Sequence, residues 1–213
     1  MIYLSDNDIV EKLAICDLLD DALRAFDATR ADVLVVPTLK NRIGIGMARP
    51  KVIRRLGAEV ADRLMEFLGT VREVNDYSYQ DHDLLESLDD SVEIDAGEIV
   101  LLSATAKLGD YLLLTGDKRC LKAVASCPEC EHIAKRIRGR VVCFEQIILR
   151  IIDVDGYDAV KAKVIPVLHA CDTALRAAFG SGMHATQSNT CDCLQSYIAE
   201  IRAFPIDLLM DGH

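Results

Sequence analysis

Three short acidic stretches, far apart in the chain, hold the residues that could do chemistry. Asp6 follows a short apolar start, residues 95–98 (Asp-Ala-Gly-Glu) open an apolar helical run, and Asp117 closes a strand-like run. Two of the three stretches place a carboxylate at the carboxyl end of an expected strand, the edge where open α/β sheets bind ligands. Carboxylates gathered there repel one another unless a cation lies between them, and Mg²⁺ or Mn²⁺ prefers such oxygen ligands. The pattern therefore indicates a carboxylate metal site of the kind that serves phosphoryl chemistry.

Alternating strands and helices are expected to position these acids. Apolar, β-branched runs predict strands at 1–4, 32–37, 70–74, 111–115 and 140–144. Apolar periodicity predicts helices at 9–26, 38–47, 51–68, 95–108, 118–126 and 145–152. This alternation predicts a parallel sheet with helices on both faces. After residue 153 only helices are expected, over 156–179 and 190–204. We therefore expect an α/β domain over 1–153 and a helical appendage over 154–213.

The charge of the chain is segregated along its length. The formal net charge of −10 argues against a general nucleic-acid binder. Residues 33–58 nevertheless contain no acid, whereas residues 76–98 contain nine acids and no Lys or Arg. The basic side chains lie in two stretches: Lys40, Arg42, Arg49, Lys51, Arg54 and Arg55, and then Lys118, Arg119, Lys122, Lys135, Arg136, Arg138 and Arg140. They form either ordinary solvated faces or a basic rim that contacts phosphates beside the acidic site.

The location and the cysteines follow from simple patterns. No run approaches the ~20 apolar residues that span a bilayer, and the first residues do not resemble a signal peptide, so we expect a cytoplasmic protein. The eight cysteines are then expected to be reduced thiols. Cys127 and Cys130 with His132, together with Cys191 and Cys193, suggest structural zinc. Because such a site needs four ligands and Cys-x-Cys is an unusual half-site, we favour free thiols.

In order and spacing, the acidic stretches resemble the PIN-domain family of metal-dependent nucleases. The resemblance rests on the strand–Asp start at 2–8, on 95–98 with the alanine-bearing helix that follows, and on 115–117 (Thr-Gly-Asp). It covers about 150 residues, and the Asp-x-Gly-Glu form is similar to one bacterial and archaeal branch. It implies a three-layer α/β/α sandwich, a Mg²⁺ or Mn²⁺ site and endonuclease cleavage of RNA. On this resemblance Asp6, Glu98 and Asp117 are the catalytic acids, and Asp95 is an additional metal ligand.

One acid of the family pattern is missing. The family places a second acid on the helix after the second strand, but residues 37–43 contain none. Glu59 is the next carboxylate and lies too far along, while Asp8 could compensate from the turn that holds Asp6. A missing ligand lowers metal affinity. Asp6, Asp8, Glu98 and Asp117 could also have only a structural role, because a carboxylate stabilises a helix N-terminus.

The leading hypothesis is a Mg²⁺- or Mn²⁺-dependent endoribonuclease. Its expected RNA contacts are Lys40, Arg42, Arg49, Lys51, Lys118 and Arg119. One alternative is a catalytically weakened PIN-like module that binds RNA or protein. A lower-ranked alternative is a haloacid-dehalogenase-type phosphatase, because residues 6–8 read Asp-Asn-Asp; that chemistry needs Asp6 as a nucleophile and a lysine that 73–98 does not offer. A protein partner or inhibitor and self-association stay open.

Overall fold

The computed structural model describes residues 1–37, 49–74 and 94–212 of the chain. Its strands are β1 (Ile2–Ser5), β2 (Val33–Val35), β3 (Arg72–Glu73), β4 (Tyr111–Leu114) and β5 (Val141–Val142). Over the described residues they form one five-stranded, all-parallel sheet in the order β3-β2-β1-β4-β5. The predicted α/β class with a parallel sheet is confirmed. Four strands lie within the expected segments, and β1 extends one residue beyond the expected 1–4.

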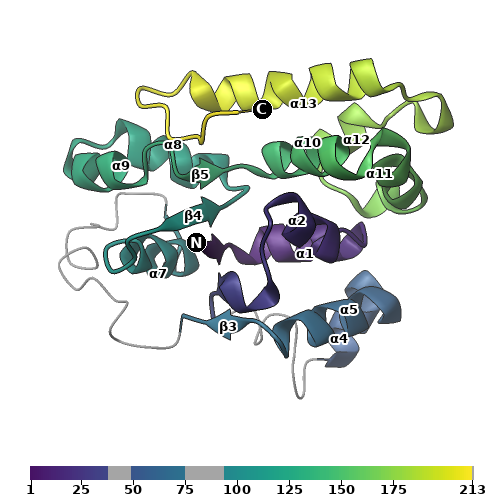
Figure 1. The fold of residues 1–213 in the computed structure, drawn as a ribbon, viewed down its shortest axis with the longest axis horizontal. Helices are drawn as coiled ribbons and strands as arrows, with labels where there is room; N and C mark the ends of the chain where they lie inside the picture. Colours follow the sequence, from purple (N-terminus) through teal and green to yellow (C-terminus); the bar gives the residue numbers. More distant parts are fainter. Residues whose placement is uncertain (38–48, 75–93, 213) are drawn as a thin grey trace.

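Helices surround this sheet (Figure 1). The α-helices are α1 (Asn7–Ile15), α2 (Leu19–Ala25), α4 (Arg49–Leu56), α5 (Ala58–Leu68), α7 (Ala96–Ala104), α8 (Lys118–Ser126), α9 (Glu131–Ile137), α10 (Phe144–Asp155), α11 (Tyr157–Val164), α12 (Thr173–Ala178) and α13 (Gln187–Arg202). Short 3₁₀ turns are η1 (Arg30–Asp32), η3 (Pro128–Cys130), η4 (Ile165–Ala170) and η5 (Gly182–His184). The helix expected at 38–47 falls outside the described residues.

The two central strands, β1 and β4, set the position of the site. Every residue of β4 is buried, as expected for a strand covered on both faces. The register pairs Ser5 with Leu114, and the backbone N–H of Asp6 donates to the carbonyl of Leu114 at 2.9 Å. The strand ends at Asp6 and Thr115 are therefore neighbours, as predicted.

The strand order reverses between β1 and β4. From β1 the chain moves through β2 to β3 on one side, and from β4 it moves to β5 on the other. Right-handed crossovers then place the helices of these two halves on opposite faces, and α1 does pack against α5 of its own half. This arrangement is compatible with a three-layer sandwich. The carboxyl ends of β1 and β4 form the switch point where such sheets bind ligands.

Three of the predicted long helices are broken in the structure. The run 9–26 divides into α1 and α2 at Asp17, whose φ of 56° is left-handed, and the run 51–68 divides into α4 and α5 at Gly57, whose φ is 87°. The run 156–179 divides into α11, η4 and α12. There Pro166 cannot donate a backbone hydrogen bond, and Cys171 is extended. Helix α9 was not expected from the sequence.

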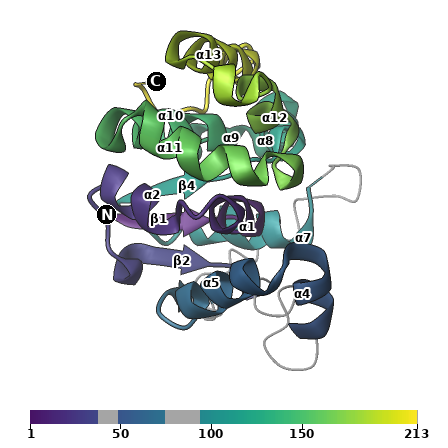
Figure 2. The same cartoon turned by 90° about the vertical axis from the view of Figure 1, so that its right-hand side faces the viewer.

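The C-terminal helices pack directly on the α/β part. Figure 2 shows α10, α11 and α13 stacked beyond the β4 side of the sheet, with α4 and α5 at the β2 side. Helix α13 contacts α8, α10 and α12. Beyond α13, Leu209 forms a parallel bridge with Val141 of β5, and the N–H of Met210 donates to the Val141 carbonyl at 2.7 Å. The last residues thus extend the sheet edge, and both parts share one hydrophobic core.

In the parts of the chain that the structure describes, no helix combines the length and the apolar character needed to cross a bilayer.

Candidate functional site

A polar pocket of about 600 Å³ opens where β1 and β4 end. Its lining includes all four residues predicted to bind metal: Asp6, Asp95, Glu98 and Asp117. These residues come from three segments spread over more than half of the chain, and the parallel sheet brings them together. Lys118 and Arg119, two of the predicted RNA contacts, line the same pocket.

Helix N-termini point the acids at this pocket. Asp6 precedes α1, Asp95 precedes α7 and Asp117 precedes α8, each at the N-cap position. The positive end of a helix dipole favours a carboxylate there. The residue that precedes each of these three helices therefore places a negative side chain at the same edge of the sheet.

Two of these acids also cap their own helices. Oδ1 of Asp95 accepts from the N–H groups of Gly97 and Glu98 at 2.8 and 2.9 Å, and Oε2 of Glu98 accepts from the N–H of Asp95 at 2.9 Å. Oδ1 of Asp117 accepts from the N–H groups of Arg119 and Cys120 at 2.7 and 3.1 Å. The cap considered from the sequence for Asp117 is thus confirmed, and Asp95 forms another. Oδ2 of Asp117 accepts from the Arg119 side chain at 3.3 Å, so a ligand at this oxygen would have to displace that contact.

Burial and mutual repulsion disturb the ionisation of the acids. The side chain of Glu98 is 6 % exposed, and burial together with the neighbouring Asp117 and Asp95 raises its pKa to about 8. Burial, with the charge of Asp8 second, raises the pKa of Asp6 to about 6. Burial also acts to raise the pKa of Asp117, but hydrogen bonds from the Cys120 backbone and from Arg119 outweigh it and lower that pKa. The pocket therefore holds protons that a cation could replace.

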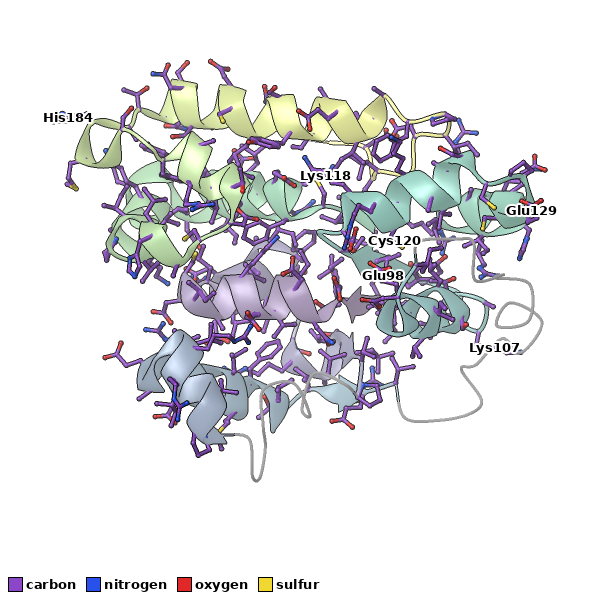
Figure 3. The ribbon with its side chains drawn as sticks, turned by 180° about the vertical axis from the view of Figure 1, so that it is seen from behind. Glu98, Lys107, Lys118, Cys120, Glu129 and His184 are labelled. Atoms are coloured by element: carbon purple, nitrogen blue, oxygen red, sulfur yellow. The ribbon has the colours of Figure 1, made fainter. Side chains whose placement is uncertain are left out.

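Cys120 of α8 is a buried neighbour of Glu98 (Figure 3). Burial, and after it the Glu98 carboxylate, raises the pKa of the Cys120 thiol above its ordinary value. The thiol is therefore neutral and does not act as a charged ligand.

The basic side chains of the pocket are held by carboxylates. Lys12 Nζ lies 2.7 Å from Asp8 and 2.8 Å from Asp172. Lys118 Nζ lies 3.3 Å from Glu200 and 3.8 Å from Glu145.

Two further contacts complete this set. Lys118 Nζ lies 4.4 Å from the ring centroid of Tyr197, and Arg119 lies 3.3 Å from Asp117. Among the described lining residues, seven carboxylates face three basic side chains, so negative charge is in excess.

Several lining residues were missed by the sequence reasoning. Glu145 is buried in the first turn of α10, directly after β5, so the rule that selected Asp117 after β4 would also have found it. Lys12 follows Asp8 by one helical turn, a spacing that predicts an ion pair. Asp172 and Tyr197 reach the pocket from the C-terminal helices, and no local pattern predicts where those helices dock.

Gly116 lies against the Asp8–Lys12 ion pair in the pocket lining. A Cβ atom at this position would lie 3.1 Å from Oδ2 of Asp8 and 3.2 Å from Nζ of Lys12. Glycine thus lets the turn after β4 approach the Asp8–Lys12 ion pair.

The remaining predicted contacts are only partly placed. Lys40 and Arg42 lie outside the described residues, and for Arg49 and Lys51 the structure describes only the backbone, in α4. Arg55 of α4 forms an ion pair of 2.6 Å with Glu11 of α1. That ion pair fastens α4 to the helix that carries Asp8 and Lys12.

The described side chains do not form a ready coordination shell. Within residues 1–37, 49–74 and 94–212, no three His, Cys, Asp or Glu side chains are grouped closely enough to hold an ion. At the proposed zinc position, Cys127 Sγ instead donates to Glu129 at 3.1 Å. In the pocket, the donors are of the hard oxygen type that suits Mg²⁺ or Mn²⁺, and a bound ion would require side-chain rotation toward one centre.

Comparison with family models, with curated proteins and with solved structures found no match to this chain.

Proposed function

We propose that the protein is a Mg²⁺- or Mn²⁺-dependent ribonuclease of the PIN type. One observation carries this proposal: Asp6, Asp95, Glu98 and Asp117 line one pocket at the switch point of a parallel sheet. A structural explanation accounts for the caps formed by Asp95 and Asp117. Asp6 forms no such cap on α1: the N–H groups of Asn7 and Asp8 favour its charged form, but burial and the charge of Asp8 outweigh them and raise its pKa to about 6.

The acids would hold the metal, and the metal would serve hydrolysis. Bound Mg²⁺ or Mn²⁺ orients a water, lowers its pKa and stabilises the leaving oxygen of a phosphodiester. Asp6, Glu98 and Asp117 are the ligands we assign, with Asp95 as a further one. In the chain itself, hydrogen bonds already favour the charged form of Asp117 and lower its pKa.

Electrostatics support a cation in this position. Glu98 retains its proton near neutral pH, because its carboxyl group is buried and because ionisation would add a charge beside Asp117 and Asp95. A divalent ion would replace that proton and let all the carboxylates ionise together. The excess of acids over basic side chains in the pocket leaves room for such a charge.

The second candidate is a weakened PIN-like module that binds RNA or protein without cleavage. Two observations favour it. The carboxylates stand apart as described above, and Lys12 and Lys118 are each held by two acids. A module of this kind would bind RNA at the rim of the pocket and would show no metal-dependent hydrolysis.

The deciding experiment is a calorimetric titration of Mn²⁺ combined with an RNA cleavage assay. Wild type should bind Mn²⁺ and cleave single-stranded RNA, and excess EDTA should abolish cleavage. Asp6→Asn should lose most Mn²⁺ binding, because it removes a charged ligand from an already reduced set. Glu59→Gln is the matched control, since the Glu59 side chain is 91 % exposed and does not line the pocket. Equal Mn²⁺ binding by wild type and Asp6→Asn would refute the site, and Mn²⁺ binding without cleavage would favour the module.

A further inference from the structure

Two buried cysteines from distant parts of the chain face each other. Cys16 ends α1, and Cys171 lies in the extended turn between η4 and α12, 155 residues later. Their Sγ atoms are 3.6 Å apart. A disulfide bond requires about 2.05 Å between the sulfurs. The two thiols are therefore in contact, and a small approach would allow a covalent bond.

Interactions on both sides hold this pair in place. Lys12 of α1 forms its ion pair with Asp172, the residue that follows Cys171. Lys163 of α11 donates to the carbonyl of Asp17, the residue that follows Cys16, at 2.9 Å. Each cysteine is thus adjacent to a residue that is fastened across the same interface. These two contacts, and not the thiols, hold the backbone at Cys16 close to the backbone at Cys171.

The two thiols are chemically unequal. Cys16 is 1 % exposed, while Cys171 is 9 % exposed. The hydrogen bond between the two thiols lowers the pKa of Cys171, and the same bond with burial raises the pKa of Cys16. Cys171, whose Sγ also lies 3.4 Å from the Val167 carbonyl, is therefore the thiol of the pair that ionises more readily, and the ionised form is the one that reacts with oxidants.

A second pocket, of about 510 Å³, lies close to the pair, between α5 and η4. Its lining includes Ile15 and Ala170, the residues that immediately precede the two cysteines, but not the cysteines themselves. Hydrogen peroxide is close to water in size, so it can enter this pocket, and it must pass the lining to reach the sulfurs.

We propose that Cys16 and Cys171 form a reversible disulfide in response to a peroxide. The Cys171 thiolate attacks one peroxide oxygen, the O–O bond breaks, and a sulfenic acid forms while hydroxide leaves and is protonated to water. Cys16, on giving up its proton, attacks the Cys171 sulfur. The S–O bond breaks, and hydroxide leaves with that proton as a second water. Two thiols are oxidised by two electrons, peroxide is reduced to two waters, and a thiol reductant reverses the bond by exchange.

The disulfide would tie α1 to the start of α12. It would close a loop that spans most of the chain, and long loops give the largest loss of unfolded-state entropy. Cys127 and Cys130 provide a control pair within the same chain, because they are close in sequence and Cys127 is half-buried. A disulfide there would close a very short loop and constrain the unfolded chain little.

The test treats the purified, dilute full-length protein with hydrogen peroxide, blocks remaining thiols by alkylation and maps the peptides by mass spectrometry. We expect a cross-linked peptide pair containing Cys16 and Cys171, with the loss of two hydrogen atoms. We also expect a rise in Tm on the order of 10 °C, reversed by dithiothreitol. Cys127→Ser with Cys130→Ser should retain both results.

The double variant Cys16→Ser with Cys171→Ser should lose the cross-link and the rise in Tm, and the Ala pair serves if the Ser pair does not fold. The peptide mapping of the wild-type protein does not depend on whether either variant folds. Alkylation of both Cys16 and Cys171 after peroxide treatment, or a bond from either to another cysteine, would overturn the proposal. This result is independent of metal binding and RNA cleavage.

Discussion

Lys12 of α1 and Asp172 at the start of α12 form an ion pair of 2.8 Å on the wall of the carboxylate pocket. The same ammonium group holds Asp8 at 2.7 Å, and it lies 5.1 Å from the centroid of the Phe144 ring. One basic side chain from the first helix thus neutralises two acids. One of them belongs to the C-terminal helices.

Removal of this charge should destabilise the fold. Lys12→Met retains the apolar stem but leaves Asp8 and Asp172, whose side chains are 42 % and 21 % exposed, without their shared counter-charge. We expect a loss of about 2 kcal/mol in the free energy of unfolding, less than for a fully buried pair because solvent reaches the pocket. Chemical denaturation in EDTA measures it. Lys135→Met is the matched control, since its pair with Glu131 is exposed and should contribute under about 0.5 kcal/mol. Equal losses in both variants would contradict this role of Lys12.

The ionisation of Glu98 should make the metal-free protein less stable at high pH. Its pKa is about 8 in the folded protein against an ordinary value of 4.5, so the folded state keeps a proton that the unfolded chain releases. Stability from this group is present below about pH 4.5 and is lost as pH rises toward 8. Since one pKa unit is worth about 1.4 kcal/mol and the pocket admits solvent, we expect a loss of about 2 kcal/mol between pH 5 and pH 8.

Glu98→Gln tests this directly. The amide mimics the protonated acid and can still accept from the N–H of Asp95. The variant should therefore be more stable than wild type at pH 8 in EDTA, with a flatter dependence of Tm on pH. Saturating Mn²⁺ should reverse the order, because metal binds the ionised carboxylate and stabilises wild type alone. A variant that stays below wild type at pH 8 in EDTA would show that Glu98 is not strained by its neighbours.

The position of the acids in the fold could be predicted from sequence because it depends on local signals. A buried apolar run followed by an acid marked the ends of β1 and β4, and alternation with helices made those strands parallel. Adjacent carboxyl ends then follow from the sheet itself. Glu145 was accessible to the same reasoning, since it follows β5 as Asp117 follows β4.

The rest depended on tertiary structure or on weak signals. Pro166 and Gly57 are ordinary helix breakers and could have divided two of the long helices. Asp17 is not a residue that ordinarily breaks a helix, because only a few aspartates adopt the left-handed backbone conformation that it has here. The approach of Asp172 and Tyr197 to the pocket depends on how α13 packs on α10 and how α12 packs on α13. The periodicity of these helices predicts that each has a buried face but not which element covers it.

The last residues of the chain should contribute to stability through β5. Leu209 is buried and bridges Val141, while Met210 donates to the Val141 carbonyl. Leu209→Ala should reduce the free energy of unfolding by about 3 kcal/mol, because it leaves a cavity at the sheet edge. Val154→Ala is the control for a truncated apolar side chain, since Val154 is 54 % exposed and should change stability by under about 0.5 kcal/mol. Similar stabilities of the two variants would indicate that the C-terminal strand pairing is not maintained in solution.

RNA binding, if present, should depend on Arg119 at the rim of the pocket. Its side chain is largely exposed and lies beside Asp117, so it can reach a phosphate without breaking a buried pair. Arg119→Ala should weaken the binding of single-stranded RNA in EDTA and reduce the slope of log affinity against log salt by about 0.7, the value for one phosphate contact on a single strand. Lys107→Ala is the control, because Lys107 lies just beyond the C-terminal end of α7, away from the pocket lining (Figure 3). Fluorescence anisotropy at several salt concentrations measures both quantities. An affinity that is undetectable at low salt, or that does not change with salt, would remove the support for an RNA substrate and favour a protein partner instead.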